Sequence, residues 1–187
     1  MLKKILVAID RSPMGREVFN QALSLAKATG GSIMLLHILS YDDKGSPVML
    51  ANYPYFDVGM NDAARQLYQE QWREFENQGL GMLNRFADEA KVAGVEVELT
   101  QIPGSPSSSI CQVAKNWEAD LIVMGRRGFS GFKELILGSV SNYVLHHAPC
   151  SVFIHHHEEV KDTQVSSHSE VRNQKSEIRS QKSEVKN

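Results

Sequence analysis

Short apolar runs alternate with amphipathic segments over the first 155 residues, and this alternation restricts the possible folds of the chain. The run over 4–9 is continuously apolar, and 32–39 nearly so, which is typical of strands covered on both faces of a sheet. Ser12 and Pro13 mark the start of a helix, and Gly30 marks its end. Strands that alternate with helices form βαβ units, so the sequence predicts a parallel sheet with right-handed crossovers.

The same patterns place each expected element. The strands are expected over 4–9, 32–39, 95–102, 121–124 and 151–154, and the helices over 13–29, 62–93, 107–117 and 139–147. We expect 40–60 to be a loop and the long helix after it to be weakened near Gly79 and Gly81, because glycine disfavours helix. Alternating polarity in 95–102 indicates an edge strand. The predicted fold is a doubly wound α/β fold, a five-stranded parallel sheet in the order 3-2-1-4-5 with helices on both faces.

In that strand order the direction of winding reverses between the first and fourth strands. Ligands of open α/β sheets bind outside the carboxyl ends of the strands at this switch point. The first strand ends at Asp10, and the fourth ends at Met124 and Gly125. A crevice between these two strand ends is therefore the predicted ligand site.

A glycine-rich spacing begins where the fourth strand is expected to end. Gly125, Gly128, Gly138 and Ser139 form the pattern G-x2-G-x9-G-S, whose last two residues open the next helix. Backbone amides at such a junction can point into one pocket, and the helix N-terminus adds partial positive charge, so an anion such as phosphate is favoured. The hydroxyls of Ser139 and Ser141 can bind the same anion, although Ser139 can equally be only a cap. The alternative for the glycines is that they only turn the chain.

Three charged residues adjoin the strand ends that form the predicted crevice. Asp10 can accept a hydrogen bond from a ribose hydroxyl or help to hold a hydrated metal ion, or it can simply cap the helix that follows. Arg126 and Arg127 can bind a phosphate through both guanidinium nitrogens, or they can be solvated surface arginines.

Composition and absent motifs argue against several other functions. A net charge of −2 provides no field to recruit nucleic acid or an anionic membrane, and no apolar run approaches the about 20 residues of a bilayer span. The P-loop pattern, the dinucleotide glycine pattern and the nucleophile elbow are all missing from the sequence. No acid, base and nucleophile group stands out as a catalytic constellation. We therefore expect no nucleic-acid partner, no membrane association and no catalytic residues.

Cysteine and histidine usage fits the same expectation. Cys111 and Cys150 are too few for a disulfide framework, and no secretory leader is recognisable, which favours the reducing cytoplasm. The histidines at 155–157 lack the spacing of a specific metal-ligand set.

The segment 156–187 has a different composition from the rest. It is almost free of large apolar residues, and a seven-residue repeat runs through 170–176, 177–183 and 184–187. One apolar residue per repeat is half of what a coiled-coil seam contains. We expect a domain over 1–155 followed by a polar, disordered tail over 156–187, to which we assign no function.

The chain resembles the universal stress protein family over residues 2–155, and its ATP-binding branch in particular. The matching segments are KILVAID at 4–10 with Ser12, LLHI at 35–38, ADLIVMG at 119–125, the G-x2-G-x9-G-S pattern, LGSVS at 137–141 and HAPCSV at 147–152.

This resemblance implies that ATP lies in the crevice described above. The positions that match the family's ATP contacts are Ala8, Ile9, Asp10, Ile38, Met124, Gly125, Arg127, Gly128, Gly138, Ser139, Val140 and Ser141. By this resemblance 8–10 border adenine and ribose, and Ile38 binds adenine through its backbone. Residues 124–128 wrap the ribose and phosphates, and 138–141 hold the phosphate tail. The resemblance also implies a homodimer through the fifth strand, Cys150 to Ile154, an arrangement that the tail could modify.

These features together predict an ATP-binding regulatory protein of the cytoplasmic stress response. The expected ligand is ATP, with or without Mg²⁺ or Mn²⁺, and nucleotide occupancy or oligomeric state is the expected signal. Two alternatives stay open. The first is a slow ATP hydrolase or adenylyl transferase, although the pyrophosphatase-type S-G-G-x-D-S loop is absent. The second is a nucleotide-independent interaction or chaperone-like module built on the aromatic residues of 40–80, which we expect instead to pack against their own domain: Tyr53, Tyr55, Phe56, Tyr68 and Trp72.

Overall fold

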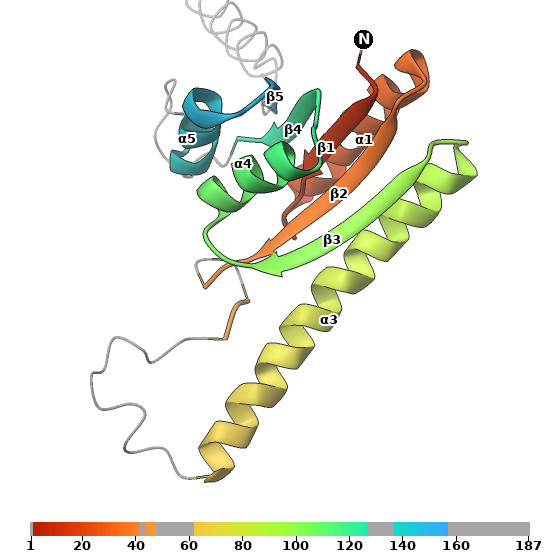
Figure 1. Ribbon diagram of the computed structural model, residues 1–187. Helices are drawn as coiled ribbons and strands as arrows, with labels where there is room; N and C mark the ends of the chain where they lie inside the picture. The colour runs from red at the N-terminus through yellow and green to blue at the C-terminus, as the bar shows by residue number, and fades with distance from the viewer. Residues whose placement is uncertain (1, 42, 44, 48–61, 127–136, 157–187) are drawn as a thin grey trace, which may run out of the picture. The chain divides into compact units, whose positions relative to one another are not determined.

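A five-stranded parallel sheet in the order β3-β2-β1-β4-β5 forms the centre of the protein (Figure 1). The computed structural model describes residues 2–41, 43, 45–47, 62–126 and 137–156. The strands are β1 (Lys4–Ala8), β2 (Ser32–Leu39), β3 (Val97–Pro103), β4 (Leu121–Gly125) and β5 (Ser151–His155). This strand order and the parallel pairing confirm the predicted fold class.

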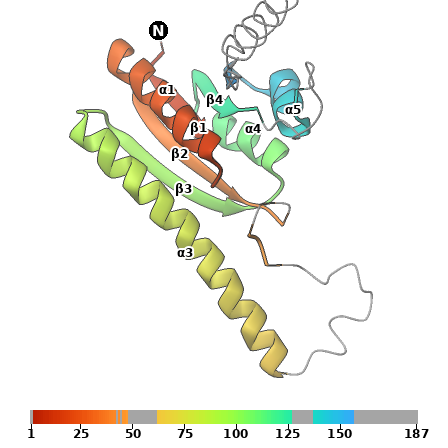
Figure 2. The same cartoon turned by 180° about the vertical axis from the view of Figure 1, so that it is seen from behind.

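Helices cover both faces of the sheet, as predicted. They are α1 (Pro13–Thr29), α3 (Asp62–Val92), α4 (Pro106–Asn116) and α5 (Ser139–His147). The pair α1 and α3 packs on one face and the pair α4 and α5 on the other, as comparison of Figures 1 and 2 shows. One compact unit extends over Met1–His156. Most of the expected loop, 48–61, and the predicted tail from 157 onward lie outside the described residues.

The position of β1 at the centre of the sheet explains why its sequence is continuously apolar. Ile5, Leu6 and Val7 have no exposed surface. Ile5 and Val7 contribute to the core beneath α1 and α3, whereas Leu6 contributes to the core beneath α4. Because successive side chains of a strand point to opposite faces, a strand covered on both faces has no solvent-exposed position for a polar residue.

The long helix α3 is continuous, so the expected weakening near Gly79 and Gly81 was wrong. Gly79 is buried where α3 crosses β2 and β3. A Cβ atom there would lie 2.7 Å from Nδ1 of His37 and would collide with Oε1 of Gln101. The missing side chain thus permits close packing of helix and sheet, and tertiary contacts along the buried face of α3 outweigh the poor helix propensity of glycine.

Asp120, in the turn before β4, ties the beginnings of β1 and β4 together. Its carboxylate accepts hydrogen bonds from the backbone N–H groups of Lys3 at 2.8 Å and Lys4 at 3.0 Å. These bonds, that from Lys3 first, lower the pKa of Asp120 below its ordinary value because they stabilise the ionised form.

The two glycines of α3 should respond oppositely to alanine. Gly79→Ala should lower the free energy of unfolding by about 1–3 kcal/mol, because a methyl group has no room against His37 and Gln101. Gly81→Ala, whose new methyl group would meet only Nη1 of Arg85 at 3.9 Å, should raise it by about 0.5–1 kcal/mol. Urea unfolding measures both. Equal effects of the two substitutions would contradict the close packing at position 79.

Asp120→Asn should destabilise the protein at neutral pH but not in acid. A carboxyl whose pKa is lower in the folded than in the unfolded state stabilises the fold above its unfolded pKa, and this stabilisation is lost as the pH falls through its folded pKa. Urea unfolding at pH 7 and at about pH 3 compares the two regimes. The exposed Asp88→Asn on α3 is the control. A wild-type to Asp120→Asn difference that stays constant with pH would refute the assignment.

Candidate functional site

The two strand ends that the sequence predicted to meet are direct neighbours. Ala8 at the end of β1 pairs in register with Met124, the residue before Gly125 at the end of β4. The backbone N–H of Ile9 donates to the carbonyl of Leu36 on β2 at 2.9 Å, so β1 stays held on its other side as well. The ends of three neighbouring strands thus bring together the predicted positions at 8–10, 38 and 124–125.

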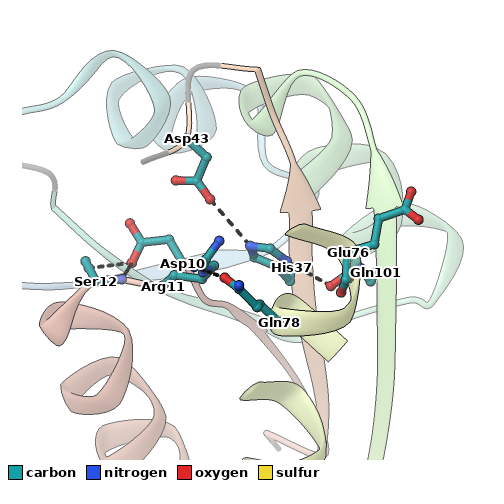
Figure 3. Close-up of polar contacts among 8 residues, drawn as sticks. All are labelled: Asp10, Arg11, Ser12, His37, Asp43, Glu76, Gln78 and Gln101. Atoms are coloured by element: carbon teal, nitrogen blue, oxygen red, sulfur yellow. Dashed lines mark hydrogen bonds and ion pairs between the residues drawn. The ribbon is translucent and has the colours of Figure 1, made fainter. Parts of the chain in front are cut away.

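Asp10 begins the turn between β1 and α1, and its carboxylate has a defined orientation (Figure 3). Oδ1 of Asp10 accepts hydrogen bonds from the backbone N–H of Ser12 at 3.1 Å and from the Ser12 hydroxyl at 2.5 Å. Ser12 occupies the N-cap position of α1, but its side chain makes no capping hydrogen bond. The hydroxyl of Ser12 therefore orients the carboxylate of Asp10 instead of capping the helix.

Gly15 in the first turn of α1 supports this corner, although sequence reasoning did not single it out. A Cβ atom at position 15 would collide with the carbonyl oxygen of Asp10 and lie 2.9 Å from Cγ2 of Ile9. The backbone N–H of Gly15 donates to the carbonyl of Ser12 at 3.0 Å. The available signal was a glycine inside the first turn of a predicted helix, where its poor propensity calls for a packing reason.

The first turn of α5 carries the remaining described positions, 138–141. Gly138 occupies the N-cap position and Ser139 is the first helical residue, so Ser139 is not the cap. The hydroxyl of Ser141 is buried and donates to the carbonyl of Gly138 at 3.0 Å, which stabilises the turn. Ser139 is exposed, and Val140 is half-buried against the core beneath α4 and α5. The N–H groups of this first turn have no partner within an α-helix and are suited to bind an anion.

Arg126 follows β4 directly and is half-buried, which does not fit the alternative of a solvated surface arginine. Its backbone N–H donates to the carbonyl of His155 at 3.1 Å. Its Nε is buried and has no hydrogen-bond partner within the described part of the chain. A buried guanidinium nitrogen of this kind suits a negatively charged group. The predicted contacts Arg127 and Gly128 lie outside the described residues.

His37 joins β2 to β3, α3 and the segment after β2 (Figure 3). It is 1% exposed, and its Nδ1 lies 3.0 Å from Oε1 of Gln101. Nε2 of Gln101 donates to the carbonyl of Glu76 at 3.0 Å, so Oε1 is an acceptor for His37 and Nδ1 carries the proton. Nε2 of His37 lies 3.5 Å from the carboxylate of Asp43. His37 lies in the strand that the sequence predicted to be covered on both faces, and its contact with Gln101 links the end of β2 beside Ile38 to β3.

The histidines and cysteines form no metal site among the described residues. Within the described ranges, no group of three His, Cys, Asp or Glu side chains is arranged to hold a metal ion. Nε2 of His155 lies 2.9 Å from Oε2 of Glu17 on α1, within hydrogen-bond distance. No helix in the described ranges combines the length and the apolar character needed to cross a membrane. The thiols of Cys111 and Cys150 are unpaired, and burial raises the pKa of both.

The aromatic residues expected to pack against their own domain are partly described. The indole of Trp72 on α3 lies 5.7 Å from the ring of Phe75 and 5.2 Å from that of Tyr41, measured between ring centroids. Its Nε1 donates to Glu76 at 2.7 Å. Trp72 therefore packs within its own domain, as predicted, whereas Tyr53, Tyr55 and Phe56 lie outside the described residues.

Sequence comparison relates this chain to proteins of known family. The sequence pattern of the universal stress protein family matches residues 1–156. A universal stress protein of Synechocystis sp. is 36% identical over 154 residues, which make up 82% of this chain and 97% of that protein.

Solved structures with the same fold include two universal stress proteins. One, from Lactobacillus plantarum, matches with a TM-score of 0.65 at 20% sequence identity and covers 83% of this chain and 98% of its own. The other, a family protein from Arabidopsis thaliana with AMP bound, matches with a TM-score of 0.54 at 22% identity and covers 85% of this chain and 94% of its own. At these low sequence identities, the structural similarity shows that the proteins share a fold.

Gly15→Ala should disturb the corner that orients Asp10. The added methyl group collides with the carbonyl of Asp10, so we expect a loss of about 1–3 kcal/mol in the free energy of unfolding. The backbone amide NMR signals of 10–12 should shift with it. The exposed Asn20→Ala on the same helix is the control, and it should change stability by no more than about 0.5 kcal/mol. Unchanged stability and unshifted signals in Gly15→Ala would rule out the close contact.

Proposed function

This chain belongs to the universal stress protein family, and we propose that it acts as an ATP-binding regulatory protein of the cytoplasmic stress response. The observation that carries the proposal is the pairing of Ala8 with Met124, which places the ends of β1 and β4 side by side with Asp10 directly beyond. This is the switch point of the sheet, where open α/β folds bind their ligands. The family protein from Arabidopsis thaliana that shares the fold has AMP bound, which supports a nucleotide as the ligand.

The charges and donors around this point fit a nucleotide. The carboxylate of Asp10, oriented by Ser12, would accept a hydrogen bond from a ribose hydroxyl. The first-turn N–H groups of α5 and the buried Nε of Arg126 would face the phosphates, together with Arg127 and Gly128. Adenine would lie against 8–9 and the backbone of Ile38. A Mg²⁺ or Mn²⁺ ion, where present, would be held by the phosphate oxygens and Asp10.

The hydrogen bonds that the serine hydroxyls of the site already make favour a binding role over catalysis. Ser141 donates its hydroxyl to the carbonyl of Gly138, and Ser12 donates its hydroxyl to Asp10. These hydrogen bonds have structural roles: that of Ser141 stabilises the first turn of α5, and that of Ser12 orients the carboxylate proposed to contact the ribose. Nucleotide occupancy would then act as the signal and not as the first step of a reaction.

The proposal includes a homodimer formed through β5 and its flank, Cys150 to Ile154. Among the described strands, β5 is at the edge of the sheet and pairs with β4. Phe153 is 37% exposed there. A strand at the edge of a sheet that carries an exposed aromatic side chain is suited to pair with a second copy of itself.

ATP should bind with a dissociation constant below about 1 mM, and Asp10→Asn should weaken binding by about tenfold or more, because the hydrogen bond loses its charged acceptor. AMP should bind more weakly than ATP, since it lacks the outer phosphates that α5 and Arg126 would contact. Isothermal titration calorimetry on the full chain measures all three.

Asp88→Asn serves as the matched control, because Asp88 is an exposed aspartate on α3 whose side chain pairs with Lys91. It should leave ATP affinity unchanged. The proposal fails if ATP does not bind below about 1 mM, or if Asp10→Asn and Asp88→Asn bind ATP as well as the wild type does.

A further inference from the structure

A hollow of about 540 Å³ lies between the start of α1 and the middle of α3. Its walls include Arg11 and Ser12 from the β1–α1 turn, Arg16 from α1 and Arg85 from α3. It lies on the face of the sheet that α1 and α3 cover, whereas α5, which would hold the nucleotide phosphates, covers the opposite face. The hollow is therefore a feature separate from the proposed nucleotide crevice.

Arg11 projects from the β1–α1 turn toward α3 and is held in one orientation. Its guanidinium lies over the ring of Phe75, 5.3 Å from the ring centroid, and Nη2 donates to Oε1 of Gln78 (Figure 3). Nη1 is buried and has no hydrogen-bond partner among the residues that the structure describes. A stacked and hydrogen-bonded guanidinium has already lost much of its rotational freedom. Ligand binding to it therefore costs little further conformational entropy.

Arg16 lines the hollow and is paired with a carboxylate of α3. Its guanidinium makes two hydrogen bonds to the carboxylate of Glu89, at 2.5 and 2.9 Å, and lies 4.4 Å from the centroid of the Phe86 ring. Phe86 in turn stacks on Phe19, with centroids 4.6 Å apart. Because Glu89 balances its charge, Arg16 contributes shape and orientation and not the net field of the hollow.

The remaining charges leave the hollow positive. Arg11 and Arg85 face a single lining carboxylate, that of Glu74, which accepts a hydrogen bond from Nε2 of Gln78 at 2.8 Å. Met82 and Phe86 add an apolar floor, and Asn77 adds a polar amide to the wall. Arg11 and Arg85 both line the hollow, and guanidinium groups are suited to bind the oxygen atoms of a phosphate or carboxylate group.

We propose that this hollow is a second ligand site of the protein, which binds a small phosphate- or carboxylate-bearing molecule between Arg11 and Arg85. Ser12 borders the hollow and also hydrogen-bonds the carboxylate of Asp10, so both sites share one corner of the chain. The residues that form it lie in the β1–α1 turn, α1 and α3, so its occupancy can be measured separately from that of ATP.

The test is an NMR titration of the full chain with inorganic phosphate and, separately, with citrate, at constant ionic strength. Backbone amide signals of 11–12 and 77–86 should shift and saturate with at least one of the two anions, and the anion that saturates identifies the ligand class. Arg85→Gln should weaken this binding by about tenfold or more, because a charged hydrogen-bond donor is lost. Gly81→Leu should abolish it, because Gly81 lines the hollow and has only the Arg85 guanidinium near its missing Cβ.

Arg65→Gln is the matched control: it removes the same charge from an exposed position of α3 outside the hollow and should bind like the wild type. Shifts that never saturate, or affinities unchanged in Arg85→Gln and Gly81→Leu, would overturn the second site. Shifts confined to 138–141 would also overturn it while leaving the ATP proposal intact. Conversely, saturable shifts around Arg85 in a protein that fails to bind ATP would support the second site and reject the nucleotide proposal alone.

Discussion

Burial of the central strand β1 on both faces is the constraint on which the rest of the structure depends. Ile5, Leu6 and Val7 are fully removed from solvent, and burial of each such side chain contributes about 1.5–3 kcal/mol to folding. Because β1 pairs with β2 on one side and β4 on the other, its end can meet only the ends of those two strands. The position of Asp10 beside Met124 and Gly125 follows from this pairing and not from any contact of Asp10 itself.

The turn from β1 to α1 connects the two faces of the protein through very few residues. The carboxylate of Asp10 is held by Ser12 at the strand ends, whereas Arg11, the residue between them, extends to Phe75 and Gln78 on α3. Gly15 allows α1 to approach the carbonyl of Asp10 closely enough to keep this turn compact. Ligands proposed for the crevice and for the hollow would therefore contact adjacent residues of one rigid turn, which provides a direct physical route for each to affect the other.

Close packing of α3 against the sheet supports the end of β2 in a similar way. The gap left by Gly79 accommodates His37 and Gln101, and the carbonyl of Glu76 on the same helix orients the Gln101 amide. A buried polar network of this kind is stable only when its donors meet acceptors, so the amide of Gln101 and the proton on Nδ1 of His37 specify one arrangement of helix and strand. Helix propensity alone predicted a weak point here, because propensity describes the local chain only. It takes no account of the His37 and Gln101 side chains that pack against Gly79.

The sequence by itself indicated the strands and helices, because apolar runs, caps and turn residues act within a few positions of one another, and the alternation of strands and helices then predicted the strand order. It therefore placed Met124 and Gly125 correctly at the end of β4, whereas β1 ends at Ala8 and Asp10 lies in the turn just beyond it. Only the tertiary structure decided which side chains meet across the fold. His37 and Gln101 are 64 positions apart, and Arg16 and Glu89 are 73 apart, so no local periodicity relates them. The positive hollow between α1 and α3 exists for that reason only after the helices have packed on the sheet.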